Sequence, residues 1–381
     1  MSRSHANSAY SSAETKAKPD EHDSVMVRDP QKTSFGVPLS DSSGGKVPTI
    51  SRRPVVLLTP VFEDKLSFAR LCREVTATNI KRDIWILAID DGSTVAPPEL
   101  SAIRDVGLTG AIIRLRRNSG HQAAIAIGLS YLDSLGADAD IVVMDCDGED
   151  KPSDIAALLA QLASPETQVA FASRKQRSEG LVFRGFYAAY KMIFRLLTGM
   201  ALPFGNFMAL SPIAVSRLVA MHETYIHLAS SVLASRLVIA GVPTGRGVRY
   251  FGGSQMGFTS QVLHGLRSIV VFSETVLTRI ALACLFTIGI CALLAAVAAV
   301  LKLTGHASPG WFTTVIGTLI VIAMQTGVLT TIILLMTGLT KSGPPPRVRG
   351  AHIDYIREIE IIGCLTSAPN AHTVCARPNA P

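Results

Sequence analysis

Between Pro54 and Ala172, short apolar runs alternate with stretches of helical spacing, and this alternation limits the fold more than any other feature of the chain. Strands that alternate with helices form a mostly parallel sheet with helices on both faces. We therefore predict an α/β domain with strands over residues 55–59, 84–89, 111–115, 141–144 and 169–172. Helices are predicted over residues 63–78, 119–135 and 153–162.

Polar motifs follow these predicted strands at their carboxyl ends, where open α/β sheets bind ligands. They cover residues 60–64, 90–93, 116–122, 145–150 and 173–177. Because all five fall at the same edge of the predicted sheet, they support a ligand site better than any one motif does. We expect them to surround a single crevice.

The acidic motif at residues 145–150 follows the apolar run that begins at Ile141. Alternate side chains of a strand share a face, so Asp145 and Asp147 should point the same way, with Cys146 opposite. Mg²⁺ takes one or two protein carboxylates and completes its shell with phosphate oxygens. The motif therefore indicates a hard-cation site, although a solvated acidic turn would explain the same residues.

A second acidic motif, Asp90-Asp91-Gly92-Ser93-Thr94, also follows an apolar run, and taken alone it could be a simple Asx-type turn. Facing the first motif across a crevice, it could bind ribose or base while the first holds a divalent cation on a diphosphate. The chain has no G-x-x-x-x-G-K-S/T loop, and no G-x-G-x-x-G follows a strand, which disfavours P-loop and dinucleotide sites. A metal-held nucleotide diphosphate is then the natural leaving group.

Residues 280–301 and 312–339 are apolar and uncharged, and each run is long enough to span a ~30 Å hydrocarbon core. We predict two transmembrane helices that form a hairpin joined by residues 302–311. Basic residues flank the pair on both outer sides, which places both termini and the catalytic domain in the cytoplasm by the positive-inside rule. These residues are Arg267, Arg279, Lys341, Arg347 and Arg349.

The remaining segments follow from composition. Residues 1–50 are predicted to be a disordered tail, 51–258 the catalytic domain, 259–279 a juxtamembrane amphipathic helix and 341–381 a cytoplasmic tail with a short helix over 353–362. A basic amphipathic helix over 181–198 is typical of a membrane surface, although an ordinary helix with snorkelling bases would fit as well. The net charge of +7 indicates attraction of the chain to anionic membrane lipids. Only 6% of the residues are aromatic, so no nucleic-acid partner is expected. All six cysteines are expected to be reduced.

Five motifs together resemble family 2 glycosyltransferases, and specifically the group that transfers sugars to polyprenyl phosphates. They are T-P-V-F-E-D (59–64), D-D-G-S-T (90–94), R-N-S-G-H-Q-A-A (117–124), M-D-C-D-G-E-D-K-P (144–152) and R-G-V-R-Y-F-G-G-S-Q-M (246–256). The resemblance implies a GT-A-like fold, a nucleotide-sugar donor, a divalent metal, Mg²⁺ or Mn²⁺, and inversion at the anomeric carbon.

The resemblance also implies roles for single residues. The nucleoside would be contacted by Pro60, Phe62, Glu63, Asp90, Asp91 and Ser93, and the donor sugar or diphosphate by Asn118 and Gln122. The metal would be surrounded by Asp145, Asp147 and Glu149, of which the first two would be catalytic. Phosphate groups would be bound by Arg174, Arg184, Arg246 and the catalytic Arg249, with Ser254 on a loop above the site.

The chain departs from the family pattern at three places. Gly148-Glu149 replaces leucine-glutamine, Gln255 replaces a lysine, and Asn206 replaces an aspartate that is a candidate base in some relatives. A lipid phosphate is largely anionic at neutral pH and needs little help from a base, so an asparagine at this position is compatible with a phosphate acceptor. Asn206 is therefore predicted to bind substrate.

We therefore predict a membrane-anchored inverting glycosyltransferase that moves a sugar from a nucleotide diphosphate to a polyprenyl phosphate. Alternatives are a glycosyltransferase with another lipid or glycan acceptor and a catalytically silent membrane scaffold of the same fold. A processive synthase is disfavoured because the Q-x-x-R-W motif is absent. Whether the chain forms a homo-oligomer is left open.

Overall fold

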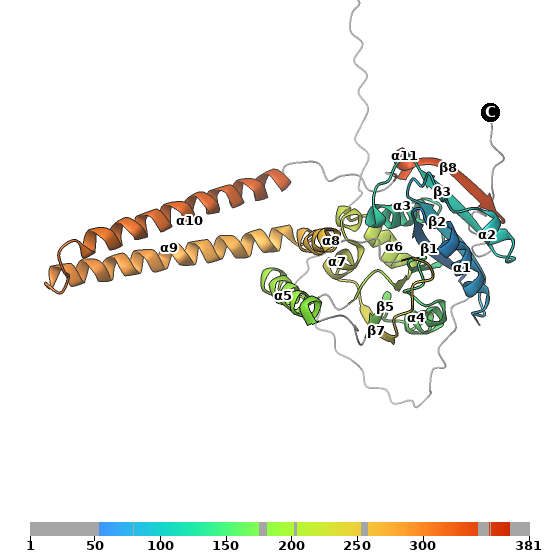
Figure 1. The fold of residues 1–381 in the computed structure, drawn as a ribbon, viewed down its shortest axis with the longest axis horizontal. Coiled ribbons are helices and arrows are strands. Elements are labelled where there is room, and N and C mark those ends of the chain that lie inside the picture. The colour runs from blue at the N-terminus through green and yellow to red at the C-terminus, as the bar shows by residue number, and fades with distance from the viewer. Residues whose placement is uncertain are drawn as a thin grey trace, which may run out of the picture. The chain divides into compact units, whose positions relative to one another are not determined.

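The computed structural model describes residues 53–78, 80–174, 181–201, 204–252, 258–341, 350 and 352–365, and the predicted disordered tail lies outside them. The described residues form one eight-stranded sheet of order β7-β5-β6-β4-β1-β2-β3-β8 (Figure 1). The strands are β1 (Val55–Val61), β2 (Ile84–Asp90), β3 (Thr109–Leu115), β4 (Asp140–Val143), β5 (Val169–Arg174), β6 (Met208–Leu210), β7 (Ile239–Thr244) and β8 (Ile356–Ile362).

The centre of the sheet is parallel. β1 pairs in parallel with β2 and β4, β2 with β3, and β5 with β7. β6 lies antiparallel between β4 and β5, and β8 is antiparallel to β3. The predicted α/β fold with a mostly parallel sheet is confirmed, as a mixed sheet.

Helices cover both faces of the sheet because the central strands are apolar on both sides. All seven residues of β1 are buried. Val56 and Leu58 pack in one core with α3, and Val55 and Leu57 pack in the other with α1 and α4. Full burial of one such side chain contributes roughly 1.5–3 kcal/mol. The helices of this domain are α1 (Lys65–Thr76), α2 (Ser101–Arg104), α3 (His121–Ser134), α4 (Ile155–Leu162), α6 (Pro212–Val219), α7 (Leu228–Ala234) and α11 (His352–Tyr355), with 3₁₀ turns at Pro152–Asp154 and His222–Tyr225.

Four further helices carry the apolar and amphipathic segments: α5 (Leu181–Thr198), α8 (Phe258–Val270), α9 (Ser273–Leu303) and α10 (Trp311–Lys341). Phe194 of α5 packs in a small core with Val271, Phe272 and Val276, where α8 gives way to α9. α9 and α10 lie side by side and are joined by residues 304–310 (Figure 1). Both are long and apolar enough to cross a membrane, with mean hydropathies of 2.7 and 2.3.

The C-terminal segment differs from its prediction. The helix expected over residues 353–362 is wrong: after the four-residue α11 the chain forms β8, which adds to the edge of the sheet. His352 anchors this return, because its ring is buried and lies 3.0 Å from the Ser130 hydroxyl on α3. The expectation that every cysteine is reduced is also wrong, since Cys364 is disulfide-bonded.

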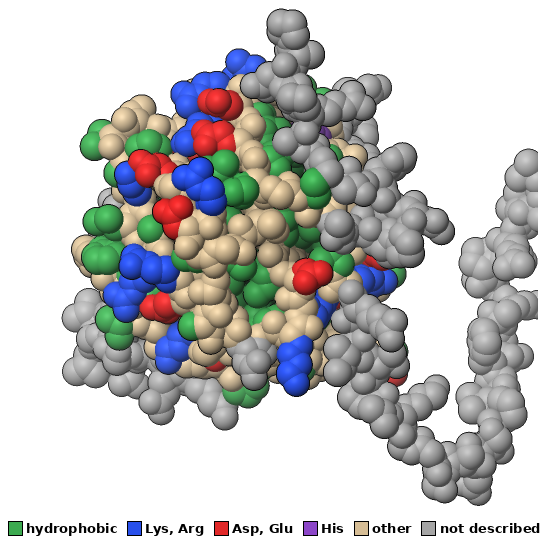
Figure 2. Space-filling view, turned by 90° about the vertical axis from the view of Figure 1, so that its right-hand side faces the viewer, with side chains coloured by type: hydrophobic (Ala, Val, Ile, Leu, Met, Phe, Trp, Pro, Cys, Tyr) green, Lys and Arg blue, Asp and Glu red, His purple; other side chains and the backbone are tan. Residues whose placement is uncertain are grey.

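Charges of both signs share the surface of the sheet domain. On the face shown in Figure 2, Lys and Arg side chains are interspersed with Asp and Glu side chains. Exposed ion pairs such as Arg70–Glu74 and Lys65–Glu99 contribute little stability, because water screens them.

Candidate functional site

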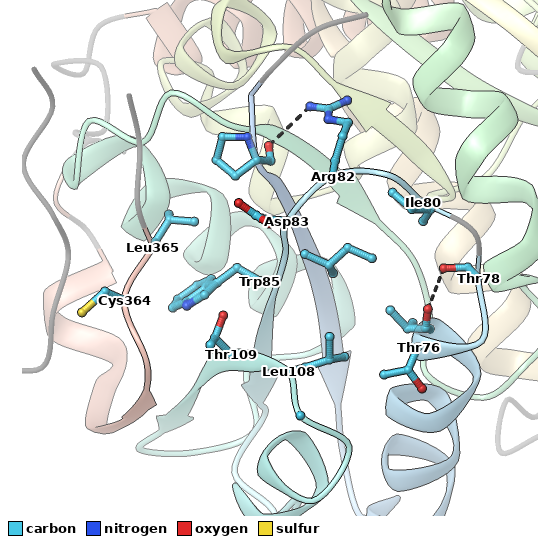
Figure 3. Close-up of a pocket in the computed structure, with 14 residues that line it drawn as sticks. Thr76, Thr78, Ile80, Arg82, Asp83, Trp85, Leu108, Thr109, Cys364 and Leu365 are labelled. Carbon is cyan, nitrogen blue, oxygen red and sulfur yellow. Dashed lines mark hydrogen bonds between the residues drawn. The ribbon is translucent and has the colours of Figure 1, made fainter. Parts of the chain in front are cut away.

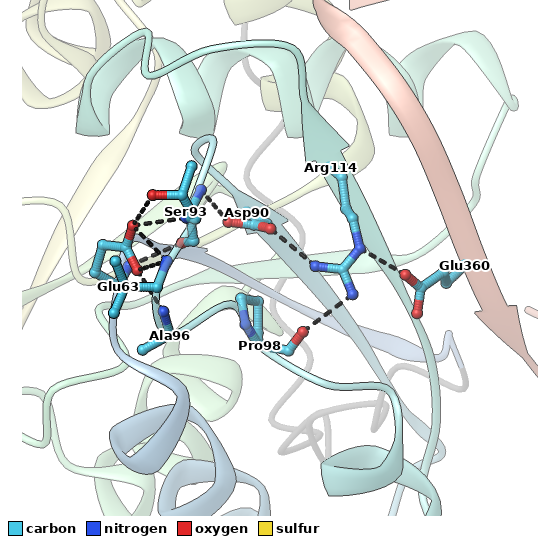
Figure 4. Close-up of polar contacts among 9 residues, drawn as sticks. Glu63, Asp90, Ser93, Ala96, Pro98, Arg114 and Glu360 are labelled. Carbon is cyan, nitrogen blue, oxygen red and sulfur yellow. Dashed lines mark hydrogen bonds and ion pairs between the residues drawn. The ribbon is translucent and has the colours of Figure 1, made fainter.

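The loops after β1 and β2 are tied together at the carboxyl edge of the sheet. The Glu63 carboxylate accepts hydrogen bonds from the backbone N–H groups of Thr94 (2.7 Å), Val95 (2.9 Å) and Ala96 (2.6 Å). In return the Glu63 N–H donates to the Ser93 hydroxyl at 2.8 Å (Figure 4). The backbone bonds to Thr94 and Ala96 lower the pKa of Glu63. Glu63 has a φ of 49°, an uncommon value for a residue with a side chain, and these bonds hold it there.

Asp90 and Asp91 are both buried, and each organises backbone. Asp90 Oδ1 accepts from the Ser93 N–H at 2.9 Å, which closes an Asx-type turn. Asp91 accepts from Ser119 N–H (2.7 Å) and Gly120 N–H (2.9 Å), which fixes the loop that leads into α3. Burial raises the pKa of Asp91, and these two N–H groups act against that rise. Both carboxylates therefore shape the loops of the expected nucleoside site.

The acidic motif after β4 lies in a turn. β4 ends at Val143, so the strand argument for Asp145 and Asp147 does not apply as stated. The expected alternation nevertheless holds, because Cys146 is buried in the core while the Asp145 and Asp147 side chains are 38% and 14% exposed. Asp150 is buried and accepts from the Asp145 N–H at 3.1 Å. The turn thus leaves the Asp145 and Asp147 side chains partly exposed after the carboxyl end of β4.

A segment following β7 lies against this turn. Gly247 N–H donates to the Glu149 carbonyl (2.9 Å), and Tyr250 N–H donates to the Asp147 carbonyl (2.7 Å). The Tyr250 hydroxyl donates to Glu74 on α1 at 2.7 Å, and its ring covers Gly148, where an added Cβ would lie 2.6 Å from it. Gly148 also has a φ of 90°, so both its backbone conformation and the lack of space for a Cβ favour glycine at this position.

Two arginines of this segment neutralise the acidic turn. Arg249 Nη2 lies 2.5 Å from Asp147 Oδ2, and its Nε lies 3.8 Å from Glu149 Oε1. Arg246 Nη2 lies 2.6 Å from Glu149 Oε2. The extra negative charge that Glu149 brings to the motif is therefore compensated within the protein. The sequence did not reveal this pairing because 97 residues separate Arg246 from Glu149.

His121, the first residue of α3, is a site residue that the sequence reasoning did not single out. Its Nε2 lies 3.3 Å from Asp145 Oδ1 and 3.1 Å from the Asn206 amide nitrogen. The pKa of His121 is lowered by removal from water, whereas the charges of Asp150, Asp91 and Asp147 act to raise it. The ring joins the acidic turn to the position where the family pattern has an aspartate. The sequence feature that could have identified His121 as a site residue was its position inside the R-N-S-G-H-Q-A-A motif.

Other predicted residues fall into three groups. Phe62 is 42% exposed beside Glu63, and Asn118 is exposed next to Gly92, so both can reach a ligand. Pro60 is buried in β1. Ser254 and Gln255 lie outside the described residues, and so do the side chains of Arg174 and Arg184, although their backbones belong to β5 and α5.

Gln122 makes a contact inside the protein. It is 3% exposed, and its Oε1 accepts from the Leu228 N–H at 2.7 Å. This oxygen holds the start of α7 against α3, and the donor contact of Gln122 stays a prediction. Gln122 follows His121 by one residue, about 100° around α3, so the two side chains point in different directions.

The predicted three-carboxylate metal group is not formed. Among the described residues, no three His, Cys, Asp or Glu side chains are arranged to hold a metal ion. Arginines engage both Glu149 and Asp147, and Asp145 lies 3.3 Å from His121 Nε2. Two carboxylates suffice for Mg²⁺ when substrate phosphates complete its shell.

A cavity of about 490 Å³ lies at the opposite, amino end of the central strands (Figure 3). It is lined in part by Pro54, Arg82, Trp85, Thr109 and Leu365. Arg82 is already paired with Asp140 at 2.6 Å. Because ligands of open α/β sheets bind beyond the carboxyl ends of strands, this cavity is not the expected substrate site.

Residues 58–220 match the model of the family described as glycosyl transferase family 2, so the chain carries a glycosyltransferase domain. No curated protein sequence matches the chain.

Similar solved structures include glucosyl-3-phosphoglycerate synthase from Mycobacterium tuberculosis in complex with Mn²⁺, uridine-diphosphate-glucose and glycerol 3-phosphate. It is 18% identical, covers 60% of this chain and 80% of its own, and has a TM-score of 0.40. The same enzyme in complex with Mg²⁺ and uridine-diphosphate is 14% identical, covers 59% and 79%, and has a TM-score of 0.42.

Proposed function

We propose that this chain, with its glycosyltransferase domain, is a membrane-anchored enzyme that transfers a sugar from a nucleotide diphosphate to a polyprenyl phosphate, with inversion. The donor would bind at the carboxyl edge of the sheet. Its nucleoside would lie over the Glu63–Ser93 loops and its diphosphate near the acidic turn at Asp145 and Asp147.

The observation that supports anchoring of the enzyme beside its lipid substrate is the way the chain enters and leaves the apolar hairpin. α8 leads directly into α9, and after α10 the chain returns to add β8 to the sheet of the catalytic domain. If α9 and α10 span a membrane, both of their outer ends must be on the side of the catalytic domain. This supports the predicted topology independently of the positive-inside rule.

The acceptor would approach between α5 and α8. Their exposed apolar side chains, among them Met192, Leu196, Leu263 and Leu266, suit the boundary between headgroups and acyl chains. The Tyr190 hydroxyl and Ser268 Oγ are 2.5 Å apart, which joins the two helices. The proposed phosphate of the lipid would then lie at the membrane surface, at the same depth as α5 and α8.

A divalent metal, Mg²⁺ or Mn²⁺, fits the donor set, with Asp145 and Asp147 as its protein ligands. When bound, it would neutralise charge that develops on the leaving diphosphate. Asp147 now accepts from Arg249 and from the Glu149 N–H at 2.9 Å, so Arg249 must release Asp147 before a cation binds there. The freed guanidinium could then bind phosphate oxygens with two parallel N–H groups.

The remaining residues would orient the reactants. His121 contacts both Asp145 and Asn206, and the His121 and Asn206 side chains could donate hydrogen bonds to phosphate oxygens. The chain offers no carboxylate at position 206, and an anionic lipid phosphate can attack the anomeric carbon without transferring a proton.

The silent-scaffold alternative has one observation in its favour: arginines already occupy Asp147 and Glu149. Purified full-length protein in detergent should be supplied with Mg²⁺, a panel of nucleotide sugars, and undecaprenyl or dolichyl phosphate, and its lipid products analysed by mass. A sugar-phosphate lipid formed only with metal supports the proposal. Metal-dependent hydrolysis of the donor without lipid product favours another acceptor, and neither activity favours the scaffold.

A further inference from the structure

β8 brings an acidic side chain to the donor side of the sheet from a distant part of the sequence. In the β3–β8 pairing, Arg114 lies opposite Glu358 and Ile112 lies opposite Glu360. Glu360 is therefore the diagonal neighbour of Arg114 on the same face, within reach of a long side chain. Glu360 Oε1 accepts from Arg114 Nε at 2.5 Å, across 246 residues of sequence (Figure 4).

Arg114 is engaged at all three of its nitrogens. Besides Glu360, it donates from Nη1 to Asp90 Oδ2 (2.9 Å) and from Nη2 to the Pro98 carbonyl (3.2 Å). Its side chain is 13% exposed, and that of Asp90 is 2% exposed. Burial acts to lower the pKa of Arg114, but its bonds to Glu360 and Asp90 raise it, so the guanidinium stays charged. Partners at all three nitrogens fix the orientation of the guanidinium, and a lysine could not reproduce this arrangement.

The contacts continue from Asp90 into the loops of the donor site. Its other oxygen accepts from the Ser93 N–H, and the Ser93 hydroxyl accepts from the N–H of Glu63. The Glu63 carboxylate in turn holds the N–H groups of residues 94–96. One connected series of hydrogen bonds, most of them charge-assisted, thus runs from β8, which follows the apolar hairpin, to the loops after β1 and β2.

We propose that Glu360 is a positioning residue for the nucleoside end of the donor site, acting through Arg114 and Asp90. This inference rests on the proposed function, because it takes the loops at Glu63 and Ser93 as the nucleoside-binding loops. It also assigns a role to the C-terminal return: the strand that completes the sheet edge also sets the shape of the donor site.

Glu358 supplies a matched control. It lies on the same strand and the same face as Glu360, is exposed, and stands directly opposite Arg114 in the register. Two pairs of variants make identical chemical changes two residues apart. One pair is Glu360→Gln and Glu358→Gln, and the other is Glu360→Leu and Glu358→Leu. Gln keeps an acceptor but loses the charge, so Glu360→Gln should have the smaller effect of the two changes at this position.

The test uses the full-length protein in detergent with Mg²⁺. Calorimetry would measure binding of the nucleoside diphosphates UDP, GDP and dTDP, and hydrogen exchange would follow the amides of residues 93–96. We expect Glu360→Leu to raise the dissociation constant of the diphosphate that the wild type binds by roughly three- to tenfold, and to speed exchange in that loop. The acceptor KM should stay within about twofold of the wild-type value, since the series of bonds does not reach α5 or α8.

Three results would overturn the assignment. If Glu360→Leu binds the diphosphate as Glu358→Leu does, Glu360 has no positioning role. If donor and acceptor constants change equally, together with a lower thermal midpoint, Glu360 supports the domain in general. A wild-type chain that binds none of the three diphosphates refutes the proposed donor site itself, and this is seen before any variant is made.

Discussion

Gly92 allows the two donor-site loops to approach each other, and replacing it with alanine should separate them. Gly92 has a φ of +78°, and an added Cβ would lie 2.7 Å from the carbonyl carbon of Arg117 and 2.7 Å from the amide nitrogen of Asn118. Both neighbours are backbone atoms, so neither can yield by changing a rotamer. The loop that carries Asp91 must therefore move away from the loop at residues 117–120, which Asp91 now holds through Ser119 and Gly120.

The magnitude has two parts. A left-handed φ costs a residue with a Cβ about 1–2 kcal/mol. Forcing an extra carbon against packed backbone costs roughly a further 1–3 kcal/mol. For a domain of this size about 1 kcal/mol shifts the thermal midpoint by roughly 2–4 °C. We expect Gly92→Ala to lower the midpoint by more than 4 °C or so and to weaken donor binding.

Gly107→Ala is the matched control. Gly107 has a φ of +76°, nearly the same as Gly92, but an added Cβ would meet nothing within 4 Å. It should show only the cost of the backbone conformation, about 1–2 kcal/mol, and unchanged donor binding. Thermal unfolding in detergent and donor calorimetry on both variants measure the difference. Equal midpoints and equal donor affinities in the two variants would refute the argument from steric contact.

Further expectations concern the metal, the acceptor, the topology and pH. Asp147→Asn should reduce transfer by orders of magnitude while the protein still inserts and folds; near-normal turnover at ordinary Mg²⁺ would remove Asp147 from the metal site. Arg249→Lys should cost about 1.5–3 kcal/mol in transfer, with donor binding less affected; if donor binding collapses instead, Arg249 belongs to the diphosphate. A cysteine introduced by Ser308→Cys, in the turn between α9 and α10, should react with an impermeant thiol reagent added outside intact cells, and labelling only after lysis would contradict the topology. Burial lowers the pKa of His227 to about 3, so between pH 6.5 and pH 3 the unfolded chain binds a proton that the folded chain does not, and stability falls as pH falls. His227→Asn, which keeps an acceptor for the Ser230 N–H at the start of α7, should weaken that dependence in urea unfolding; an unchanged pH profile would count against it.

Local pattern in the sequence was enough to predict the elements that form the active edge. The apolar runs at 55–59 and 84–89 became β1 and β2, each extended by one or two residues, and the helix predicted over 181–198 has those bounds in the structure. These predictions succeed because the period of apolar residues is a property of neighbouring positions, which burial on one or both faces enforces. The grouping of polar motifs at strand ends follows from the same pattern once the strands are parallel.

Contacts between distant segments were decided only by the tertiary structure. The stretch I-R-E-I-E-I-I at 356–362 was assigned to a helix, yet it is a strand, because the free edge of β3 offers hydrogen bonds that a short isolated helix could not match. Glu149 reads as a metal ligand in the sequence and is paired with Arg246 in the fold, and Gln122 reads as a donor contact and is buried. Which carboxylate faces a ligand and which faces an arginine depends on charges brought close by folding, and the order of residues along the chain carries no record of those distances.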